Sequence, residues 1–319
     1  MRLPPDPPSI ARAARALIAG DIVGFPTETV YGLGARADRS EAVRRIYEKK
    51  GRPSENPSIV HAATSEAALA LAEDVAPEVR ELARVLWPGP LTLVLPVGRG
   101  AVAPEVTAGG TTIAVRVPAH PVAHALLQAC ELPIAAPSAN RSTAISPTTA
   151  DHVEKSLGDA FLLIDAGPTG FGIESTIVDV TAEPWVILRR GSIDMTRLSS
   201  FGAVRDRADS IVPPGAPMRA PGTGARHYAP RVPLVIVPRA ELAGAAAPGT
   251  AFLVMRPAPA LPPGTICEML DAEPEPYARA LYAALHRLED AGASRIVVEG
   301  VPPGPEWAAV RDRLTRAAR

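Results

Sequence analysis

The sequence predicts an α/β protein with an open, twisted, mixed sheet, followed by a smaller, doubly wound α/β domain. Apolar runs typical of strands and amphipathic helices are interleaved over the first part of the chain, but they do not alternate strictly. Periodicity then stops in a stretch rich in proline and glycine, and strand and helix patterns resume beyond it. In a chain of 319 residues we therefore expect a first domain over 1–204, a linker over 205–232 and a second domain over 233–319.

Caps and apolar faces predict the elements of the first domain. Ser9 is expected to cap a helix that runs to Ala19, and a short buried strand follows at 22–25. Ser40 is expected to cap a second helix that runs to about Lys49. The remaining predicted strands are 58–61, 91–97, 111–117, an apolar strand that begins at Ala135, 161–164, 176–180 and 186–188. The remaining helices are 65–74, 77–87, 121–130 and 149–157.

The linker does not have the composition of a flexible tether. Its prolines restrict the chain to few conformations, whereas a tether is rich in glycine and serine. The stretch ends in Arg226-His-Tyr-Ala-Pro230, so we expect it to dock and to cover a functional site rather than to act as a passive spacer. Beyond it the predicted strands are 233–237, 251–255 and 295–299, and the predicted helices are 275–291 and 306–318.

Composition limits the class of protein. The formal net charge is −1, which argues against a protein whose main work is coating nucleic acid. The two cysteines, Cys130 and Cys267, lie far apart, so neither a disulfide framework nor a Cys-x-x-Cys metal site is predicted. The sequence has no apolar run long enough to span a membrane and no secretory signal pattern at its start. We therefore expect a cytoplasmic protein without membrane association.

The segment Phe25-Pro-Thr-Glu-Thr-Val-Tyr-Gly-Leu-Gly34 places hydroxyl groups where a strand ends. Ligands collect at strand ends in open sheets, and the hydroxyls of Thr27 and Thr29 can bond a polar ligand. The Gly32-x-Gly34 spacing is only a weak match to a dinucleotide fingerprint, because the next helix begins too late to hold a pyrophosphate. We predict instead that these glycines form a tight turn.

A second segment, Lys49 to His61, presents cations from a loop braced by prolines. The negative end of the helix dipole is enough to explain Lys49. It does not explain why Lys50, Arg52, Asn56 and His61 stand close together in a rigid loop. Such a cluster suits an anionic ligand, such as a phosphate chain together with a carboxylate.

Other polar side chains lie on apolar strands or at their ends. Alternation places Thr112 and Arg116 on the same face of one strand, and a buried arginine needs an anionic partner. That partner is either a protein carboxylate or the carboxylate of a ligand. Further strand ends carry Ser138, Asn140, Ser146, Ser175 and Arg189. Each alone fits a plain turn, but together they indicate a binding site.

Several signatures are missing from the sequence. It contains no Gly-x-x-x-x-Gly-Lys-[Ser/Thr], so a P-loop is not predicted to hold any nucleotide. His120 and His124 have helical spacing but lack the glutamate of a zinc-protease motif, so we predict a capped helix start rather than a metal site. Neither Gly-x-Ser-x-Gly nor a Cys–His nucleophile signature occurs. The predicted site binds and orients charged reactants without a covalent intermediate.

These clusters, in this order, resemble the YrdC-like catalytic domain of threonylcarbamoyl-AMP synthases. The end of the linker, Arg226-His-Tyr-Ala-Pro230, is similar to the linker signature of the two-domain form, whose smaller C-terminal domain is Rossmann-like. One departure concerns Thr143, which stands where the family usually has glycine. The matching segments are Pro26-Thr-Glu-Thr-Val-Tyr-Gly-Leu, Lys50-Gly-Arg-Pro, Asn56-Pro, Ile59-Val-His, Pro137-Ser-Ala-Asn, Ser146-Pro-Thr, Glu174-Ser-Thr and Leu188-Arg.

The resemblance implies a role for individual residues. Lys50 and Arg52 are implied to be catalytic, close to the phosphates of ATP. Around L-threonine the implied set is Thr29, His61, Arg116, the backbone of Ala136, and Ser175. Around ATP it is Arg52, Asn56, Thr112, Ser138, Ser146, Arg189 and Tyr228.

The implied reaction joins L-threonine, bicarbonate and ATP into threonylcarbamoyl-AMP and diphosphate. Mg²⁺ would accompany ATP, and no tightly bound organic cofactor and no protein-bound metal are expected. The product would pass to a downstream tRNA threonylcarbamoyltransferase, with at most a weak and transient contact between this chain and tRNA.

Two other functions remain open on the sequence. The first is an RNA-binding module, which would bind RNA in a salt-sensitive manner without turning over ATP. The second is a carbamoyl-transfer enzyme related to hydrogenase maturation proteins. Those proteins carry Cys-rich zinc motifs and an acylphosphatase-like domain, which this chain lacks.

Overall fold

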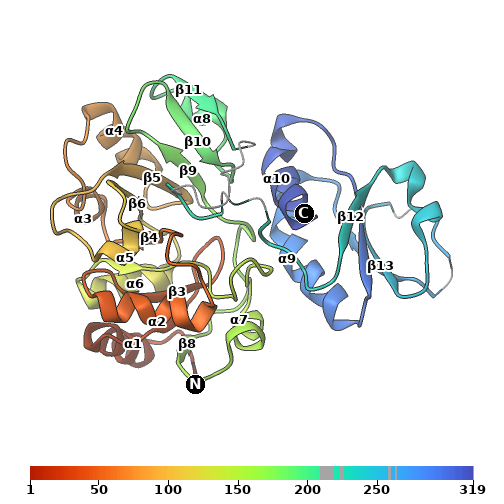
Figure 1. Ribbon diagram of the computed structural model, residues 1–319, viewed down its shortest axis with the longest axis horizontal. Coiled ribbons are helices and arrows are strands. Elements are labelled where there is room, and N and C mark those ends of the chain that lie inside the picture. Colours follow the sequence, from red (N-terminus) through yellow and green to blue (C-terminus); the bar gives the residue numbers. More distant parts are fainter. Residues whose placement is uncertain (209–218, 223, 225, 258–259, 263, 319) are drawn as a thin grey trace.

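The computed structural model describes residues 1–208, 219–222, 224, 226–257, 260–262 and 264–318, which form two lobes (Figure 1). Within this part of the chain, one lobe contains a mixed sheet of eleven strands and the other a sheet of four. This confirms the predicted α/β fold with a large open sheet and a second, smaller one. Strand β11 (Val204–Asp206) pairs with β10 (Trp185–Arg189), so the large sheet continues slightly past the predicted boundary at 204. Part of the predicted linker lies outside the described residues, and the domain boundaries stay a prediction.

The strands of the large sheet are ordered differently in space and in sequence. β4 (Ile59–His61) pairs with β6 (Thr112–Arg116) in parallel, and this register places His61 beside Arg116. β5 (Leu91–Pro96) pairs with β6 antiparallel and with β9 (Thr176–Asp179) in parallel, so strands of both directions meet near the site. The spatial order is β1 (Arg2–Leu3), β8 (Leu162–Ile164), β2 (Val23–Phe25), β3 (Gly32–Arg36), β7 (Ile134–Ala135), β4 (Ile59–His61), β6 (Thr112–Arg116), β5 (Leu91–Pro96), β9 (Thr176–Asp179), β10 and β11.

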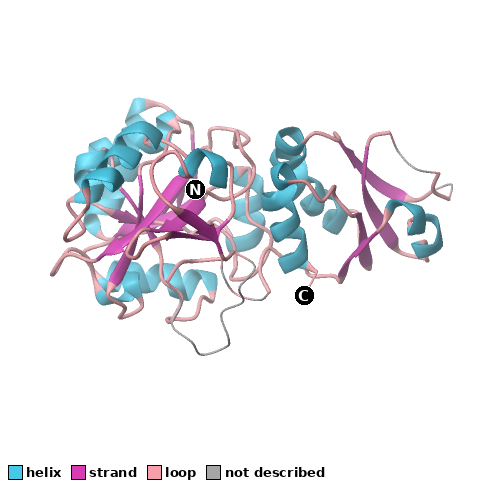
Figure 2. Cartoon of the chain, turned by 90° about the horizontal axis from the view of Figure 1, so that it is seen from above, coloured by secondary structure: helices cyan, strands magenta, loops and turns pink. Residues whose placement is uncertain are grey.

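Helices cover both faces of this sheet (Figure 2). On one face α1 (Pro7–Ala19) and α6 (Pro121–Cys130) pack together against Phe25. On the other face α2 (Ser40–Lys50) and α7 (Ala150–Leu157) bury apolar side chains against Leu33. The other helices of this lobe are α3 (Ser65–Leu69), α4 (Pro77–Leu86), α5 (Pro104–Thr107) and α8 (Met195–Leu198).

The smaller sheet is parallel, in the order β12 (Leu234–Val237), β15 (Arg295–Glu299), β13 (Thr250–Met255) and β14 (Ile266–Leu270). Helices α9 (Pro274–Asp290) and α10 (Ala308–Ala317) lie between this sheet and the larger lobe (Figure 1). Short 3-10 turns at Arg239–Glu241 and Ala243–Ala245 cover the opposite face, where Leu242 packs on Phe252. A third turn, Pro305–Trp307, precedes α10. The apolar face of α9, at Ala278, Leu281, Tyr282, Leu285 and Leu288, is buried.

The predicted start of α1 was wrong by one turn. Asp6, not Ser9, caps the helix, and its carboxylate accepts a hydrogen bond from the Ser9 N–H at 2.9 Å. Pro7 and Pro8 occupy the first helical positions, where a missing N–H costs nothing because those N–H groups have no intrahelical partner. In α2, Ser40 is the first helical residue rather than the cap, and Arg39 precedes it without a side-chain cap. His120 does cap α6 as predicted, because its Nδ1 accepts from the Val122 N–H at 3.2 Å.

The tight turn predicted at Gly32 and Gly34 is wrong, because both lie within strand β3. A Cβ atom on Gly34 would come within 2.8 Å of the Phe25 ring and 2.9 Å of Ile134 Cγ2. The glycine is therefore needed for the close approach of neighbouring side chains and not for a turn.

Four strands were not predicted: β1, β3, β11 and β14. β1, β11 and β14 lie at sheet edges, and β1 and β11 contain only two and three residues. Most side chains of β11 and β14 are partly or fully exposed, so they lack the apolar signal by which buried strands are found.

No helix in the described ranges is both long enough and apolar enough to cross a lipid bilayer.

Candidate active site

A pocket lies where the strand ends of the large sheet meet the end of the linker. It gathers eight of the residues predicted for the site: Thr29, Arg52, His61, Arg116, Ala136, Ser138, Arg189 and Tyr228. Glu174 and linker residues Pro221, Gly222 and His227 also line it. Segments spread over two hundred residues of sequence therefore converge on one cavity.

The Arg116 side of the pocket is electrically balanced. Arg116 Nη2 lies 2.7 Å from Glu28 Oε1, and both side chains are almost fully buried. Burial raises the pKa of Glu28, but the charge of Arg116, its hydrogen bond and backbone hydrogen bonds together hold the pKa below its usual value. The anionic partner that the sequence left undecided is thus a protein carboxylate. Arg116 Nη1 also donates to Thr29 Oγ1 at 2.9 Å, which fixes a hydroxyl on the pocket wall.

His61 is a neutral imidazole on the same side. Burial, together with the nearby charge of Arg116, lowers its pKa to about 3. Its Nδ1 is buried and has no hydrogen-bond partner among the described residues. Since buried polar atoms are rarely left unpaired, this atom is suited to a polar group of a ligand.

Ala136 forms the adjacent wall. Its backbone N–H donates to the Ile59 carbonyl at 2.9 Å, so the predicted backbone contact with a ligand is left to its carbonyl oxygen.

Arg52 and Lys50 contact neutral oxygens instead of carboxylates. Arg52 donates to the carbonyls of Asn56 and Pro57, the latter at 2.7 Å from Nη2. Lys50 Nζ donates to the carbonyls of Ser138, at 2.6 Å, and Asn140. Burial lowers the pKa of both side chains, and the pKa of Lys50 is lowered furthest. Only Arg52 lines the pocket, while Lys50 lies behind the loop that carries Ser138.

Arg189 is the third buried cation without a carboxylate partner in the described ranges. Its Nε donates to the Ser175 carbonyl and its Nη2 to Ser175 Oγ, both at 3.0 Å. Ser175 Oγ in turn lies 2.7 Å from Thr92 Oγ1. Arg189 also donates to the carbonyl of Pro221 in the linker, at 3.3 Å. This side of the pocket therefore holds positive charge that the neighbouring side chains do not neutralise.

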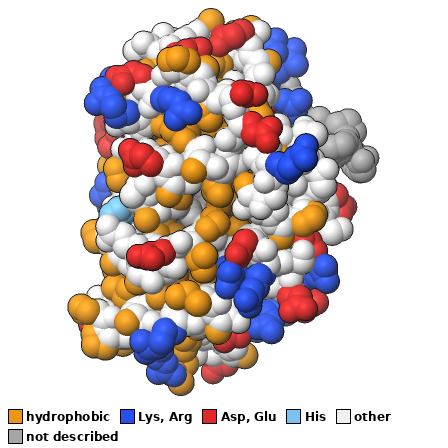
Figure 3. Space-filling view, turned by 90° about the vertical axis from the view of Figure 1, so that its left-hand side faces the viewer, with side chains coloured by type: hydrophobic (Ala, Val, Ile, Leu, Met, Phe, Trp, Pro, Cys, Tyr) orange, Lys and Arg blue, Asp and Glu red, His pale blue; other side chains and the backbone are white. Residues whose placement is uncertain are grey.

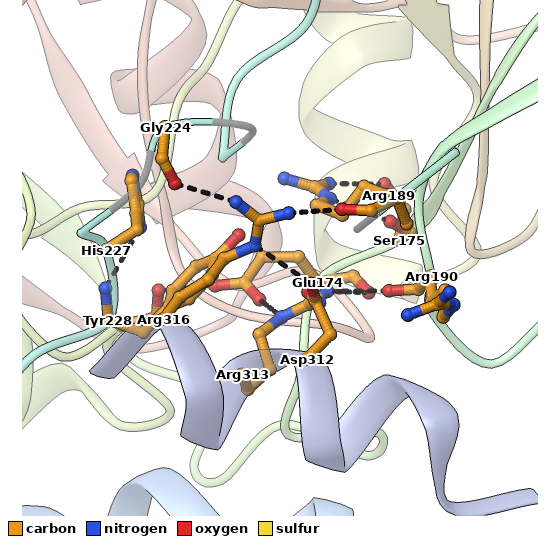
Figure 4. Close-up of polar contacts among 12 residues, drawn as sticks. Glu174, Ser175, Arg189, Arg190, Gly224, His227, Tyr228, Asp312, Arg313 and Arg316 are labelled. Atoms are coloured by element: carbon orange, nitrogen blue, oxygen red, sulfur yellow. Dashed lines mark hydrogen bonds and ion pairs between the residues drawn. The ribbon is translucent and has the colours of Figure 1, made fainter. Parts of the chain in front are cut away.

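Glu174 stands beside Arg189 but is neutralised by the second domain (Figure 4). Its Oε2 accepts from Arg313 Nε on α10 at 2.8 Å and from the Tyr282 hydroxyl on α9 at 3.0 Å. Its Oε1 accepts from the Ser146 hydroxyl. Burial raises the pKa of Glu174, but the charges of Arg313 and Arg189, together with the hydrogen bonds from Ser146 and Arg313, lower it below its usual value.

The linker docks on both lobes. Tyr228 is buried, with its ring stacked near Tyr282 and the Arg313 guanidinium 4.9 Å from its centroid. The Ala229 N–H donates to the Thr143 carbonyl at 2.9 Å. The end of the linker therefore bridges the site and the second domain.

Five of the predicted site residues do not line the pocket: Lys50, Asn56, Thr112, Ser146 and Ser175. Ser146 and Ser175 lie directly behind it, where they hold Glu174 and Arg189. The Asn56 carbonyl receives Arg52 Nε, and its Oδ1 is buried without a partner among the described residues. Thr112, at the start of β6, is only partly buried.

Sequence reasoning missed the importance of Glu28, Thr92 and Arg313. Thr92 stands in a short apolar stretch, which is a weak signal for a buried polar contact, and Glu28 lies between the polar residues Thr27 and Thr29, where nothing in the sequence marks it as buried. Arg313 offers a better one, because it is spaced three residues from Val310 and four from Ala317 on the buried face of α10. A charged residue on an apolar helix face calls for a buried partner.

Two family models match consecutive parts of the chain. Residues 15–191 match the model of the Sua5, YciO and YrdC family, described as telomere recombination. Residues 193–319 match the model described as threonylcarbamoyl-AMP synthase, C-terminal domain. The chain belongs to the threonylcarbamoyl-AMP synthase family. It has the longer, two-domain form of that family, as the sequence predicted.

Individual relatives of this family are similar over most of the chain. The threonylcarbamoyl-AMP synthase of Pyrococcus abyssi is 46% identical over 228 residues, which cover 70% of this chain and 66% of the relative. That of Bacillus subtilis is 44% identical over 230 residues, covering 72% of this chain and 66% of the relative. The matched stretch thus spans slightly less than two thirds of either relative.

One solved structure of the family matches the whole fold. P. abyssi Sua5 complexed with L-threonine has a TM-score of 0.90 and 36% identity, and the match covers 100% of this chain and 97% of that chain.

Proposed function

We propose that this chain is an L-threonylcarbamoyladenylate synthase, which converts L-threonine, bicarbonate and ATP into threonylcarbamoyl-AMP and diphosphate. The main support is the charge distribution of the pocket. One side presents an arginine already paired with Glu28, and the other presents Arg52 and Arg189 without carboxylate partners in the described ranges. A small zwitterion suits the first side, and a polyphosphate suits the second.

L-threonine is proposed to occupy the Arg116 side. A threonine carboxylate is recognised by a guanidinium, and its ammonium group by carbonyl oxygens such as that of Ala136. Thr29 and His61 line the pocket and offer a hydroxyl and an imidazole to the threonine hydroxyl, whereas Ser175 lies behind it and would act through Arg189. The related P. abyssi protein, whose structure was solved with L-threonine, supports threonine as the ligand of this pocket.

ATP is proposed to lie on the Arg189 side. Arg52 and Arg189 would contact the phosphates, while Lys50 would act through the Ser138 loop that it holds. Asn56, Thr112, Ser146 and Tyr228 complete the proposed ATP side, with Ser146 acting through Glu174. Low-dielectric surroundings strengthen these cations' interaction with developing negative charge.

In the proposed reaction the threonine amine attacks bicarbonate with loss of water, or attacks CO2 formed from it with loss of a proton, to give N-carboxy-threonine. The new carboxylate then attacks the α-phosphorus of ATP, and the bond to the β-phosphate oxygen breaks to release diphosphate. The work of the protein is to position three polar reactants and to offset their charge.

Mg²⁺ is proposed to enter with ATP. Mg²⁺ commonly binds through substrate phosphates and keeps several waters. Glu174 on the pocket wall and Glu28 behind Arg116 are each held by an arginine, so phosphate oxygens are better ligands here than a protein cage. When bound, the ion would offset charge on the phosphates.

The linker is proposed to cover this site. Pro221, Gly222, His227 and Tyr228 line the pocket, and Tyr228 is held between the two domains. Tyr228→Ala in the full chain should raise the ATP concentration needed for half-maximal turnover. Turnover equal to that of the unaltered protein at low ATP would show that the segment is only a spacer.

The decisive assay measures diphosphate release from ATP. The proposal requires turnover that depends on both threonine and bicarbonate, and turnover without either reactant would contradict it.

Serine should be a better substrate than valine, because a pocket built around a hydroxyl rejects an analogue that lacks one. The opposite ranking would show that the pocket reads shape.

The RNA-binding alternative predicts salt-sensitive RNA binding and no turnover. On the face of the larger lobe turned away from the second domain, basic and acidic side chains are interspersed, so that face offers no broad basic surface (Figure 3).

The product would pass to a tRNA threonylcarbamoyltransferase, and we expect the reaction to take place in the cytoplasm.

A further inference from the structure

Three charged residues of α10 are buried against the larger lobe. The side chains of Asp312, Arg313 and Arg316 are 4%, 0% and 4% exposed. Charged side chains are almost never this deeply buried unless they are paired. They lie outside the pocket, so a direct contact with a reactant does not explain them.

Arg313 uses its whole guanidinium in this interface (Figure 4). Its Nε donates to Glu174 Oε2 at 2.8 Å, and its Nη1 donates to Asp312 Oδ2 at 2.6 Å. Its Nη2 donates to the Arg190 carbonyl at 2.8 Å. Arg316 takes the second oxygen of Asp312 at 2.9 Å and donates to the carbonyl of Gly224 in the linker at 2.7 Å.

The charges of this cluster cancel. Glu174 and Asp312 are negative, Arg313 and Arg316 are positive, and each carboxylate contacts a guanidinium of α10. Arg189 lies within electrostatic range of Glu174 but forms no ion pair with it in the described ranges. The positive charge of Arg189 is left over because α10 neutralises the carboxylate beside it.

We propose that Arg313 is a positioning residue for ATP binding: by holding and neutralising Glu174, it keeps Arg189 free to meet the phosphates of the nucleotide. Without Arg313, Glu174 would be a buried carboxylate whose nearest uncompensated cation is Arg189. An ion pair between those two would withdraw Arg189 from ATP and would also pull on Ser175. This gives the second domain a part in the reaction, and it rests on the proposed function.

The test uses Arg313→Met and Arg313→Lys in the full chain, together with the double variant Glu174→Gln/Arg313→Met. Methionine keeps much of the volume without the charge, lysine keeps the charge, and glutamine removes the charge that Arg313 neutralises. Arg287→Met is the matched control, because Arg287 forms an exposed ion pair with Glu268 elsewhere in the same domain.

Kinetic constants from diphosphate release separate the two sides of the pocket. Arg313→Met should raise the KM for ATP at least tenfold and leave the KM for threonine within about twofold. Arg313→Lys and the double variant should each recover most of the ATP affinity, and Arg287→Met should match the unaltered protein. Rescue by the double variant is the critical result, because a merely structural role for Arg313 would not be restored by removing the charge of Glu174.

Two results would overturn the proposal: an unchanged ATP KM in folded Arg313→Met, or a double variant as impaired as the single one. If Arg313→Met does not fold, the double variant, which leaves no unpaired carboxylate at Glu174, carries the test alone, and weak ATP binding by it overturns the proposal.

Calorimetric binding of ATP separates failure of this inference from failure of the proposed function. If the unaltered protein shows no threonine-dependent turnover yet binds ATP in an Arg313-dependent manner, the function is wrong and the inference holds. If it binds no ATP, both are wrong.

Discussion

Each side of the pocket has a buried arginine, but the two arginines differ in whether a carboxylate neutralises them. Arg116 forms an ion pair with Glu28 inside its own domain, at 2.7 Å. Among the described residues Arg189 contacts only hydroxyl and carbonyl oxygens, and the carboxylate beside it, Glu174, is paired with Arg313 of the second domain. Burial alone thus does not decide whether an arginine remains available to a ligand. Its neighbours decide, and for Arg189 the decisive neighbour belongs to another domain.

The difference also suggests two kinds of function for cations in one pocket. A cation already balanced by a carboxylate can orient a zwitterion without attracting every anion. A cation left unbalanced at a cost in stability is suited to a ligand that brings several negative charges. Arg52 belongs with Arg189 in this respect, because its described partners are the carbonyls of Asn56 and Pro57.

The largest effect is expected for Arg116→Ala, which should damage both the fold and the activity. Removing Arg116 leaves Glu28 as a buried carboxylate without its cation, which should lower the free energy of unfolding by about 3 kcal/mol. Turnover should fall by about two orders of magnitude or more. Denaturant unfolding and diphosphate release measure the two effects.

The control for this variant is Glu28→Gln/Arg116→Ala, which removes both charges. It should regain part of the stability but not the turnover. Equal stability of the single variant and the unaltered protein would show that the ion pair does not balance the site.

Arg52→Ala should cost about as much activity while leaving the fold intact. Its guanidinium has no carboxylate partner among the described residues, so its loss strands no buried charge, and turnover should fall about a hundredfold or more. The measurement pairs diphosphate release with thermal unfolding. A loss of stability like that of Arg116→Ala would remove the contrast between the two sides.

The interface that braces the Arg189 side should weaken in acid. His152 on α7 and His286 on α9 stack with ring centroids 3.8 Å apart, and His286 Nε2 lies 3.2 Å from the Ser146 carbonyl. Burial is the main cause that lowers their pKa values, to about 4 for His152 and about 3 for His286. The charged groups that act on the pair are Asp151, Lys155, Arg287 and Asp290.

The direction of this change in stability with pH follows from the difference in proton binding between the folded and unfolded chain. Below about pH 6.5 the unfolded chain takes up protons on these imidazoles while the folded chain does not, so stability falls as the pH falls toward their folded pKa values. For His286 alone the loss between about pH 6.5 and pH 5 should be about 1.5 kcal/mol. His286→Asn should therefore lose less stability over that interval than the unaltered protein. Parallel stability curves for the two would contradict the assignment.

The smallest effect is expected in the loop that carries Thr143, which contacts both Lys50 and the linker. Thr143 has a φ of 66°, in the left-handed region that a β-branched residue rarely adopts, and its carbonyl accepts from the Ala229 N–H. Thr143→Gly should raise the free energy of unfolding by about 0.5 kcal/mol or more, since relief of strain exceeds the added freedom of the unfolded chain. Ser142→Gly is the control and should be slightly destabilising, because Ser142 has no positive φ. Thermal unfolding of the two variants would settle the comparison.

How far the sequence predicted the structure differed between the core and the edges. Buried strands such as β5 and β6 were found because their apolar runs are continuous. β11 and β14 were missed because half-exposed edge strands carry no such run. β3 was missed because the glycines that permit the close packing of Phe25 and Ile134 also resemble turn residues.

Prediction of the site also succeeded for local features and failed for long-range ones. The short motifs contain most of the residues that line the pocket, because each motif carries its polar groups at a strand end. They do not contain the pairing of Glu28 with Arg116 across 88 positions, nor that of Glu174 with Arg313 across 139. Such pairs are set by the register of strands and by the docking of α10.

The sequence alone determined the family, the mixed α/β architecture and the types of side chain that gather at the site, because these depend on local periodicity and on short motifs. Only the tertiary structure decided which of the buried cations are neutralised and which remain free. Charge balance is a sum over neighbours in space, and for Arg189 the neighbour that matters is carried by the second domain.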